Sequence, residues 1–366
     1  MRLEKALLML YAMPGIGPKT LRRWMTRING PADVFDLLPA ERSALPGFRA
    51  QHALNFQTTR LQHFSDQAER WLQSTDQHNL RFIPFLDSNF PVGLRHAPDA
   101  PLFLFQRGKL PPHQPILSLV GTRQPSADLA PVLMQFMKEL SAAQTSTCSG
   151  LARGVDALVH RESLRHGLFS MAVVAHGAEL AYPLQNQRLA EEIVENGCIW
   201  SEYPPGTLPE REFFPQRNRI LAGMSQALIL VQSNTTGGAM ITVKHALRYR
   251  RPVFAFAGPF NQTAYAGPLK LIAEGLVKPL LNTAQIWNIL GLEAKASQQE
   301  DTPYSTVHYS AAELPIAQEL QSEPGLCLDQ LALRTGQSPA QLLALLSLME
   351  LEGKIETLPG NRYKLG

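Results

Sequence analysis

The segment Ile116-Leu117-Ser118-Leu119-Val120-Gly121-Thr122-Arg123 decides the fold, because a short β-rich run ends at a glycine and a polar loop. Further runs of this kind follow, and helical stretches such as 128–142 and 156–166 lie between them. The predicted strands are 116–120, 146–149, 171–175, 199–201, 227–231 and 253–256. This alternation is typical of α/β proteins, in which helices flank a largely parallel sheet.

Glycine-containing motifs directly follow three of the predicted strands. They are Gly121-Thr122-Arg123, Ser149-Gly150 with Arg153, and Gly237-Gly238. Ligands of parallel sheets bind at the carboxyl ends of the strands, where glycine lets the backbone approach a phosphate closely. No G-x-G-x-x-G opens a helix and no G-x-x-x-x-G-K-[ST] is present, which disfavours NAD and ATP as ligands. We therefore expect these residues to contact a different phosphate-bearing molecule.

A second informative stretch combines aromatic rings with guanidinium groups. It reads Phe213-Phe214-Pro215-Gln216-Arg217-Asn218-Arg219-Ile220. Arginine binds phosphate oxygens with paired donors, and a phenylalanine ring stacks on any base. We predict a single-stranded nucleic-acid site in which Arg123, Arg217 and Arg219 hold successive phosphates, Phe214 stacks on a base and Asn218 adds an amide.

Six motifs in order resemble the DNA-processing protein A (DprA/Smf) family. They are Ser118 to Arg123, Ser149 to Asp156 with Ala157 and His160, Tyr182-Pro183 with Asn186, Ser201 to Gly206, Phe214-Pro215 with Arg217 to Arg219, and Ile241-Thr242. The resemblance covers about residues 80–279 and implies a Rossmann-like domain. It also implies a cytoplasmic protein of natural transformation, or competence, that binds and protects incoming single-stranded DNA. Such a protein forms homodimers through this domain and loads the RecA recombinase in DNA recombination.

The resemblance implies DNA-binding roles for a subset of these residues, with one departure. The subset is Arg123, Gly150, Phe214, Arg217, Asn218 and Arg219. Where the family has serine-glycine-serine, this chain reads Gly237-Gly238-Ala239, so backbone amides take the place of hydroxyl groups.

An enzymatic alternative is a Rossmann-like nucleotide-processing enzyme similar to nucleoside monophosphate N-glycosidases. Asp156 and His160 lie four residues apart on one predicted helical face, where a carboxylate and an imidazole can perform acid–base chemistry. Asp156 also sits where a helix N-cap belongs, which favours a structural role. In these glycosidases a glutamate that acts on the sugar stands near the position that His245 occupies here. Without a carboxylate at that position, this hydrolysis lacks its base. We expect no catalytic residue, no metal and no cofactor.

The flanking segments predict two further domains. Residues 1–75 contain Met13 to Lys19 and a similar Leu45 to Arg49, two glycine hairpins that resemble a helix-hairpin-helix or SAM-like module. DNA contact and a purely structural role are equally compatible with this module. The expected boundaries are 1–75 for the helical domain, 76–292 for the Rossmann-like domain, 293–304 for a linker and 305–366 for a winged-helix-like domain.

The last segment reads helix, helix, helix and β-hairpin, the order of a winged helix. The expected helices are 311–321, 328–334 and 338–352, and the hairpin spans 354–365. Helix 338–352 contains no Lys or Arg and six leucines, so we expect burial on more than one side and contact with a protein, not with duplex DNA.

The charge distribution and the cysteine content limit the classes of partner and the cellular compartment that we expect. The net charge of +3 divides into +8 before Gly291 and −5 from there on, so a polyanion should meet the first two thirds. Cys148, Cys198 and Cys327 lie far apart without paired spacing, which fits a reducing cytosol. No apolar run approaches the roughly 20 residues of a membrane span, and we expect the N-terminal residues to form an amphipathic helix and no signal peptide.

Overall fold

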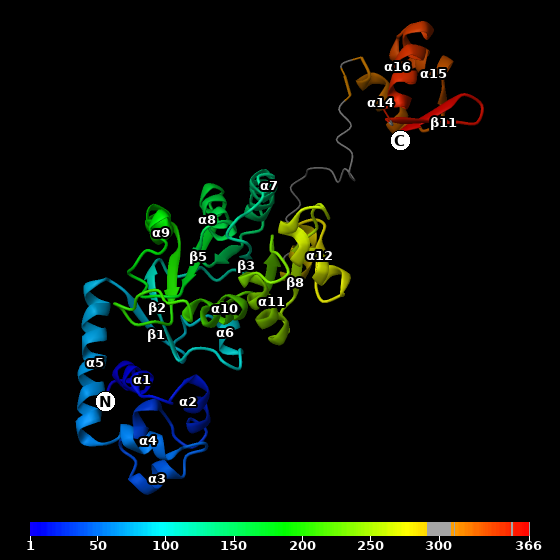
Figure 1. The fold of residues 1–366 in the computed structure, drawn as a ribbon. Helices are drawn as coiled ribbons and strands as arrows, with labels where there is room; N and C mark the ends of the chain where they lie inside the picture. Colours follow the sequence, from blue (N-terminus) through cyan, green and yellow to red (C-terminus); the bar gives the residue numbers. More distant parts are fainter. Residues whose placement is uncertain (291–308, 311, 353, 366) are drawn as a thin grey trace. The chain divides into compact units, whose positions relative to one another are not determined.

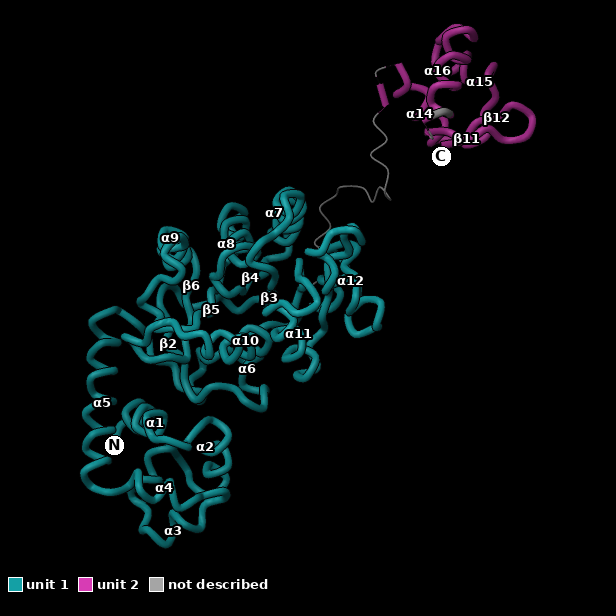
Figure 2. Tube along the Cα trace, viewed as in Figure 1, with its two compact units in different colours: residues 1–295 teal, residues 296–366 magenta. Residues whose placement is uncertain are grey.

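The computed structural model describes residues 1–290, 309–310, 312–352 and 354–365 (Figure 1). The predicted linker, residues 293–304, lies outside the described residues. The chain divides into two compact units, residues 1–295 and 296–366 (Figure 2). Within the described residues, no helix combines the length and the apolar character that crossing a membrane would require.

The N-terminal segment of the first unit is helical. It contains α1 (Leu3–Ala12), α2 (Pro18–Trp24), the 3-10 helix η1 (Pro31–Phe35), α3 (Pro39–Ser43), α4 (Ala50–Asn55) and α5 (Thr58–Gln77). Pro18 and Pro39 each stand at a helix start, where proline's missing N–H is no loss. The buried side chains of α1 belong to one hydrophobic core with Phe103 and Phe105 of the sheet. The helical segment therefore packs directly against the sheet, and a domain boundary at residue 75 stays a prediction.

A nine-stranded sheet forms the centre of the first unit, in the order β1-β2-β6-β5-β4-β3-β7-β8-β9. The strands are β1 (Arg81–Pro84), β2 (Phe103–Gly108), β3 (Ile116–Val120), β4 (Ser146–Ser149), β5 (Phe169–Val174), β6 (Cys198–Ser201), β7 (Ala227–Leu230), β8 (Val253–Phe256) and β9 (Lys278–Leu280). Strands β3 to β9 are mutually parallel, and β2 pairs antiparallel with both β1 and β6. The predicted α/β fold with a largely parallel sheet is confirmed.

Helices cover both faces of the sheet (Figure 1). One face carries α7 (Leu129–Ser141), α8 (Val155–Arg165) and α9 (Gln187–Asn196), and the other carries α6 (Val92–Arg95), α10 (Phe213–Met224) and α11 (Gly238–Arg248). The remaining helices are η2 (Leu184–Asn186), η3 (Thr263–Tyr265), α12 (Ala266–Ala273) and α13 (Ala284–Leu290). From β3, the successive strands β4, β5 and β6 are added on one side of it. The strands β7, β8 and β9 are added on its other side. The strand order therefore reverses between β3 and β7, which is where open α/β sheets bind ligands.

The second unit has winged-helix topology. It contains α14 (Leu314–Ser322), β10 (Leu326–Cys327), α15 (Leu328–Thr335), α16 (Pro339–Leu351), β11 (Ile355–Leu358) and β12 (Arg362–Leu365). Leu342 and Leu346 of α16 are buried in its core, as expected. Leu343 and Leu348 are 53% and 51% exposed, so the expectation of burial on more than one side is wrong for these two side chains. They point away because the small unit covers only one side of the helix.

Candidate functional site

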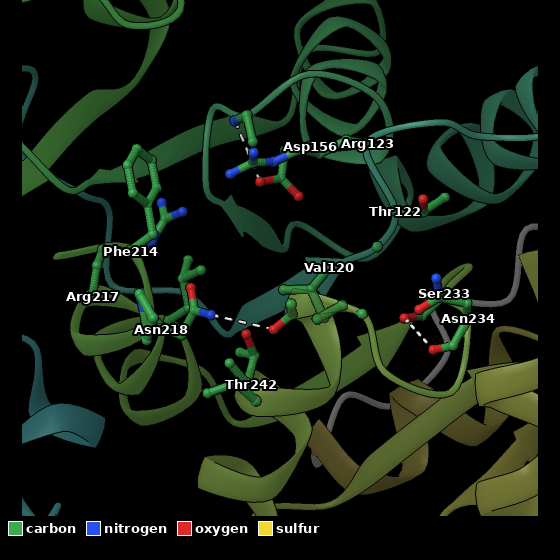
Figure 3. A pocket seen from close by; sticks show the side chains of 18 of the residues that line it. Val120, Thr122, Arg123, Asp156, Phe214, Arg217, Asn218, Ser233, Asn234 and Thr242 are labelled. Atoms are coloured by element: carbon green, nitrogen blue, oxygen red, sulfur yellow. Dashed lines mark hydrogen bonds between the residues drawn. The ribbon is translucent and has the colours of Figure 1, made fainter. Parts of the chain in front are cut away.

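A cleft of about 560 Å³ lies at the reversal point of the sheet (Figure 3). Its walls come from the loop after β3 with Thr122, the loop after β7 with Asn234, and the helices α10 and α11. Thr122 N–H donates to the carbonyl of Gln232 at 2.7 Å, which joins the two loops at the base of the cleft. The volume is in the range of small-molecule and nucleotide sites.

An arginine and an aromatic ring meet at the mouth of this cleft. The guanidinium carbon of Arg123 lies 5.7 Å from the centroid of the Phe214 ring, within cation–π range. Arg123 is exposed, and Phe214 is half-buried in the first turn of α10. The centroid of the Tyr182 ring lies 5.9 Å from that of Phe214. Figure 3 shows Phe214 and Arg123 bordering the same opening.

Two residues of this mouth were not among the predicted contacts. Arg211 lines the cleft, is exposed and lies three residues before Phe214. Tyr182 also lines the cleft and is 45% exposed. In the described part of the chain, neither Arg211 nor Arg123 has an ion-pair partner, so both charges are available to a ligand. Two features of the sequence could have indicated these residues. Arg211 stands three residues before Phe214, and Tyr182 belongs to the Tyr182-Pro183 motif.

Arg217 differs from the sequence expectation because it is only 4% exposed. Its Nη1 atom donates to the carbonyl of Gly150 at 2.8 Å and also to the carbonyl of Val173. Burial lowers the pKa of this guanidinium, and the nearby Asp156 carboxylate opposes that shift. Arg217 lines the cleft, but its guanidinium already donates to two backbone carbonyls, which a bound phosphate would have to leave unpaired. Its contact with DNA stays a prediction.

Arg219 and Ser149 also have internal partners. Both carboxylate oxygens of Glu202 accept from Arg219 Nη2 at 2.6 Å, and 15% of the arginine side chain is exposed. The Ser149 hydroxyl is fully buried and donates to the carbonyl of Leu119 at 2.7 Å. Contact of these residues with DNA stays a prediction, and it would require each side chain to share or give up its internal partner.

The glycines of the site have two different roles. A Cβ atom on Gly121 would lie 2.5 Å from Val155, and one on Gly150 would lie 2.5 Å from Asp156 and 2.7 Å from Arg217. These two glycines permit close packing inside the protein. A Cβ atom on Gly238 would meet nothing within 4 Å, and this residue begins α11 beside Gly237. The Gly237 amide donates to the carbonyl of Asn234 at 3.4 Å, so the amide of Gly238 is the one that the start of α11 offers to an anion.

Asn218 completes the wall between α10 and α11. Its side-chain amide donates to the carbonyl of Gly238 at 3.4 Å, a long hydrogen bond that places the two helix starts side by side. Figure 3 shows this bond from Asn218 as a dashed line. The other predicted contact, Arg153, is exposed and lines a neighbouring cleft, where its Nη2 donates to Gln185 at 2.9 Å.

Asp156 and His160, the candidate acid–base pair, are not joined by a hydrogen bond. Asp156 is the second residue of α8 and not its N-cap, which is Gly154. Its carboxylate accepts from the amide of Ala152 at 3.3 Å, and burial raises its pKa while the Arg217 charge opposes the shift. His160 is fully buried, its Nδ1 lies 2.8 Å from the Ser170 hydroxyl, and burial lowers its pKa to about 3. His160 therefore stays neutral within the core.

Comparisons with known proteins identify the family. The model of the DNA recombination-mediator protein A family matches residues 81–291, more than half of the chain. The chain belongs to this family. A model of the DprA winged helix domain also matches residues 294–361, which agrees with the topology of the second unit.

Individual relatives support the assignment. Protein Smf of Synechocystis is 29% identical over 386 residues, which cover 96% of each chain. The X-ray structure of DNA processing protein A from Streptococcus pneumoniae has a TM-score of 0.67 at 25% identity, over 80% of this chain and 99% of that chain. The Helicobacter pylori protein, described for its single-stranded DNA binding mode, shares the fold with a TM-score of 0.51 at 24% identity, over 58% of this chain and 95% of that chain.

Proposed function

We propose that this protein binds single-stranded DNA in the cleft between β3 and β7. The observation that carries the proposal is the pair formed by Arg123 and Phe214 at its mouth, 5.7 Å apart and both accessible. A cation beside an aromatic ring is suited to a chain of alternating phosphates and unpaired bases. Membership of the family and the single-stranded DNA binding described for the Helicobacter pylori protein support the same ligand.

The contact set differs from that expected from sequence alone. Arg123 and Arg211 hold phosphates, the helix start at Gly237 and Gly238 binds a further phosphate, and Phe214 stacks on a base. Thr122 and Asn218 supply hydroxyl and amide groups along the same wall. Gly121, Gly150 and the buried Arg217 act indirectly, because they hold the loops and α10 in place.

The proposed cellular role is taken from the family resemblance. We propose that the protein acts in natural transformation, in the cytoplasm, where it protects incoming single strands and passes them to RecA. We also propose a homodimer through the Rossmann-like domain, which would align two clefts along one strand. All of these points rest on the family resemblance and not on the geometry of the cleft. Sedimentation of the purified protein tests the dimer, and strand exchange by RecA on pre-bound single strands tests the transfer.

The DNA proposal is tested by gel shift with single-stranded and duplex DNA of one sequence across a salt series. We expect preference for the single strand, since paired bases hide the faces that Phe214 needs. Affinity should fall steeply with salt, because phosphate contacts release counterions. Equal binding of both forms, or binding independent of salt, would exclude this mechanism.

One observation favours the enzymatic alternative. Asp156 lines the cleft, and burial raises its pKa, a combination found in catalytic acids. The hydrogen bond from Ala152 and the neighbouring Arg217 give this carboxyl a structural explanation instead. Incubation with nucleoside monophosphates decides between them: release of free base that is lost in an Asp156→Asn variant would establish hydrolysis.

A further inference from the structure

We propose that the neighbouring cleft is a second nucleotide subsite for the same strand, with Tyr182 as its stacking platform. This inference rests on the proposed single-stranded DNA binding at the first cleft. The second cleft has a volume of about 640 Å³ and lies at the ends of β4 and β5, beside the turn from Tyr182 to Gln185. Its size is in the range of nucleotide sites.

The two clefts share one wall. The residues that line both are Arg123, Ala152, Tyr182 and Phe214. Because the same four residues line both clefts, a strand that leaves the first cleft past Phe214 enters the second directly. Consecutive nucleotides can therefore occupy the two clefts, with the Arg123 guanidinium between them.

The Tyr182 ring is held in place and still accessible. Behind it lies the buried His176 ring, with the two centroids 6.2 Å apart at 75°. The loop that faces the turn is fixed by Asn186, whose amide donates to the carbonyls of Leu151 at 3.0 Å and Ala152 at 3.2 Å. A supported ring that remains 45% exposed loses little conformational entropy when a base stacks on it.

The charge of the second cleft also favours a phosphate-bearing ligand. No Asp or Glu is among its lining residues, whereas Arg123 and Arg153 both are. Arg153 uses one nitrogen to bind Gln185, which directs the guanidinium and leaves further donors for a phosphate oxygen. A cationic ligand would find no carboxylate partner here.

The test measures affinity for oligothymidylates of increasing length, up to about twelve nucleotides. Arg153→Gln and Tyr182→Ala are compared with Tyr182→Phe, which keeps the ring, and with Arg211→Ala, which alters only the first cleft. We expect Tyr182→Ala to weaken the longer strands roughly 5- to 150-fold, the effect of losing one stacked base. Arg153→Gln should lower the slope of log affinity against log salt by about 0.7, and only for the longer strands.

The outcomes separate the two proposals. Retained affinity of Tyr182→Phe, with losses in Tyr182→Ala and Arg153→Gln confined to longer strands, supports the subsite. Wild-type affinity of both variants at every length, or an equal loss at every length, overturns the subsite and leaves the first cleft as proposed. Failure of the wild-type protein to bind any single strand overturns both. Because Arg153 is exposed, its variant is expected to fold. The Arg153→Gln variant therefore tests the subsite even if Tyr182→Ala fails to fold.

Discussion

Arg217 donates a hydrogen bond to the carbonyl oxygen of Gly150 at 2.8 Å, and this bond ties α10 to the loop after β4. Phe214 lies one turn earlier on the same helix. The orientation of the aromatic ring at the mouth of the cleft therefore depends on a buried arginine whose guanidinium donates to backbone carbonyls. Gly150 is required there, since a Cβ atom would lie 2.7 Å from both terminal nitrogens of Arg217.

The first prediction concerns stability. Arg217→Ala should destabilise the protein by about 3–5 kcal/mol, because two carbonyls lose their donor and the buried Asp156 carboxylate loses the neighbouring positive charge. Urea unfolding followed by circular dichroism measures the change. Arg211→Ala is the matched control, since this arginine is exposed and its removal should alter stability by less than about 0.5 kcal/mol. An Arg217→Ala protein as stable as the control would contradict the structural role.

The second prediction separates packing glycines from binding glycines. Gly238→Ala should leave the melting temperature unchanged or slightly raised, because its Cβ meets nothing within 4 Å and alanine favours a helix. The added methyl group stands where a phosphate would approach, so single-stranded DNA affinity should fall. Gly150→Ala should instead destabilise the fold by about 1–3 kcal/mol through overpacking. Undiminished DNA affinity in Gly238→Ala would remove the start of α11 from the interface.

The third prediction distinguishes charge from stacking at the mouth of the cleft. Arg211→Ala should lower the slope of log affinity against log salt by about 0.7, the contribution of one phosphate contact on a single strand. Phe214→Ala should cost about 1–3 kcal/mol of binding energy and leave that slope unaltered, because stacking releases no counterions. Fluorescence anisotropy titrations at several salt concentrations measure both quantities. If the two variants changed slope and affinity alike, the assignment of separate roles would be wrong.

The fourth prediction is a pH dependence of stability from His160. Burial lowers its pKa to about 3 in the folded protein, whereas the unfolded chain binds the proton near pH 6.5. The contribution of neutral His160 to the free energy of unfolding is therefore fully present above pH 6.5, and it is lost as the pH falls towards 3. Between pH 7 and pH 5 the loss should be about 2 kcal/mol.

Comparison of pH profiles isolates this contribution. The variant His160→Gln keeps a hydrogen-bonding group beside Ser170 and carries no titrating ring, so its unfolding free energy should fall less steeply with acid. His113→Gln changes an exposed histidine and should follow the wild-type profile. Parallel profiles for His160→Gln and the wild type would show that His160 is not the titrating group.

The central strands could be predicted from sequence because of how they are buried. Strands β3, β4 and β8 have the predicted bounds, since parallel strands covered on both faces read as continuous apolar or small-residue runs. Strands β1, β2 and β9 were not among the predicted strands. They lie at or beside the sheet edges, and β9 is only three residues long. Their positions depend on tertiary packing that a local pattern does not encode.

The site could be predicted only in part, for a similar reason. The sequence placed Arg123 and Phe214 in one site, and the structure brings them together. It did not reveal that Arg217 is buried, because the partners of this side chain are backbone carbonyls 67 and 44 residues away. A carbonyl acceptor leaves no mark on residue type, so an internal arginine and a ligand-binding arginine look identical in sequence.

The fifth prediction concerns the winged-helix unit. Its described basic residues are Arg334, paired with Glu319 and Glu323, Lys354, paired with Glu313 and Glu352, Lys364, paired with Glu356, and Arg362. Three of these four cations would have to give up an ion pair to hold a phosphate. Deleting residues 305–366 should therefore leave single-stranded DNA affinity within about twofold of the full chain, and a loss of roughly tenfold would contradict this.

The exposed face of α16 gives the reason to expect a different role for the unit. Leu343 and Leu348 are each about half exposed on the helix that would enter a DNA groove in a winged-helix protein. Leucine offers no donor or acceptor to a base edge, whereas exposed apolar side chains are common at protein contacts. Replacing both leucines with glutamine should thus leave duplex DNA binding at its wild-type level in a gel shift. A clear loss of duplex binding would show that α16 reads DNA after all.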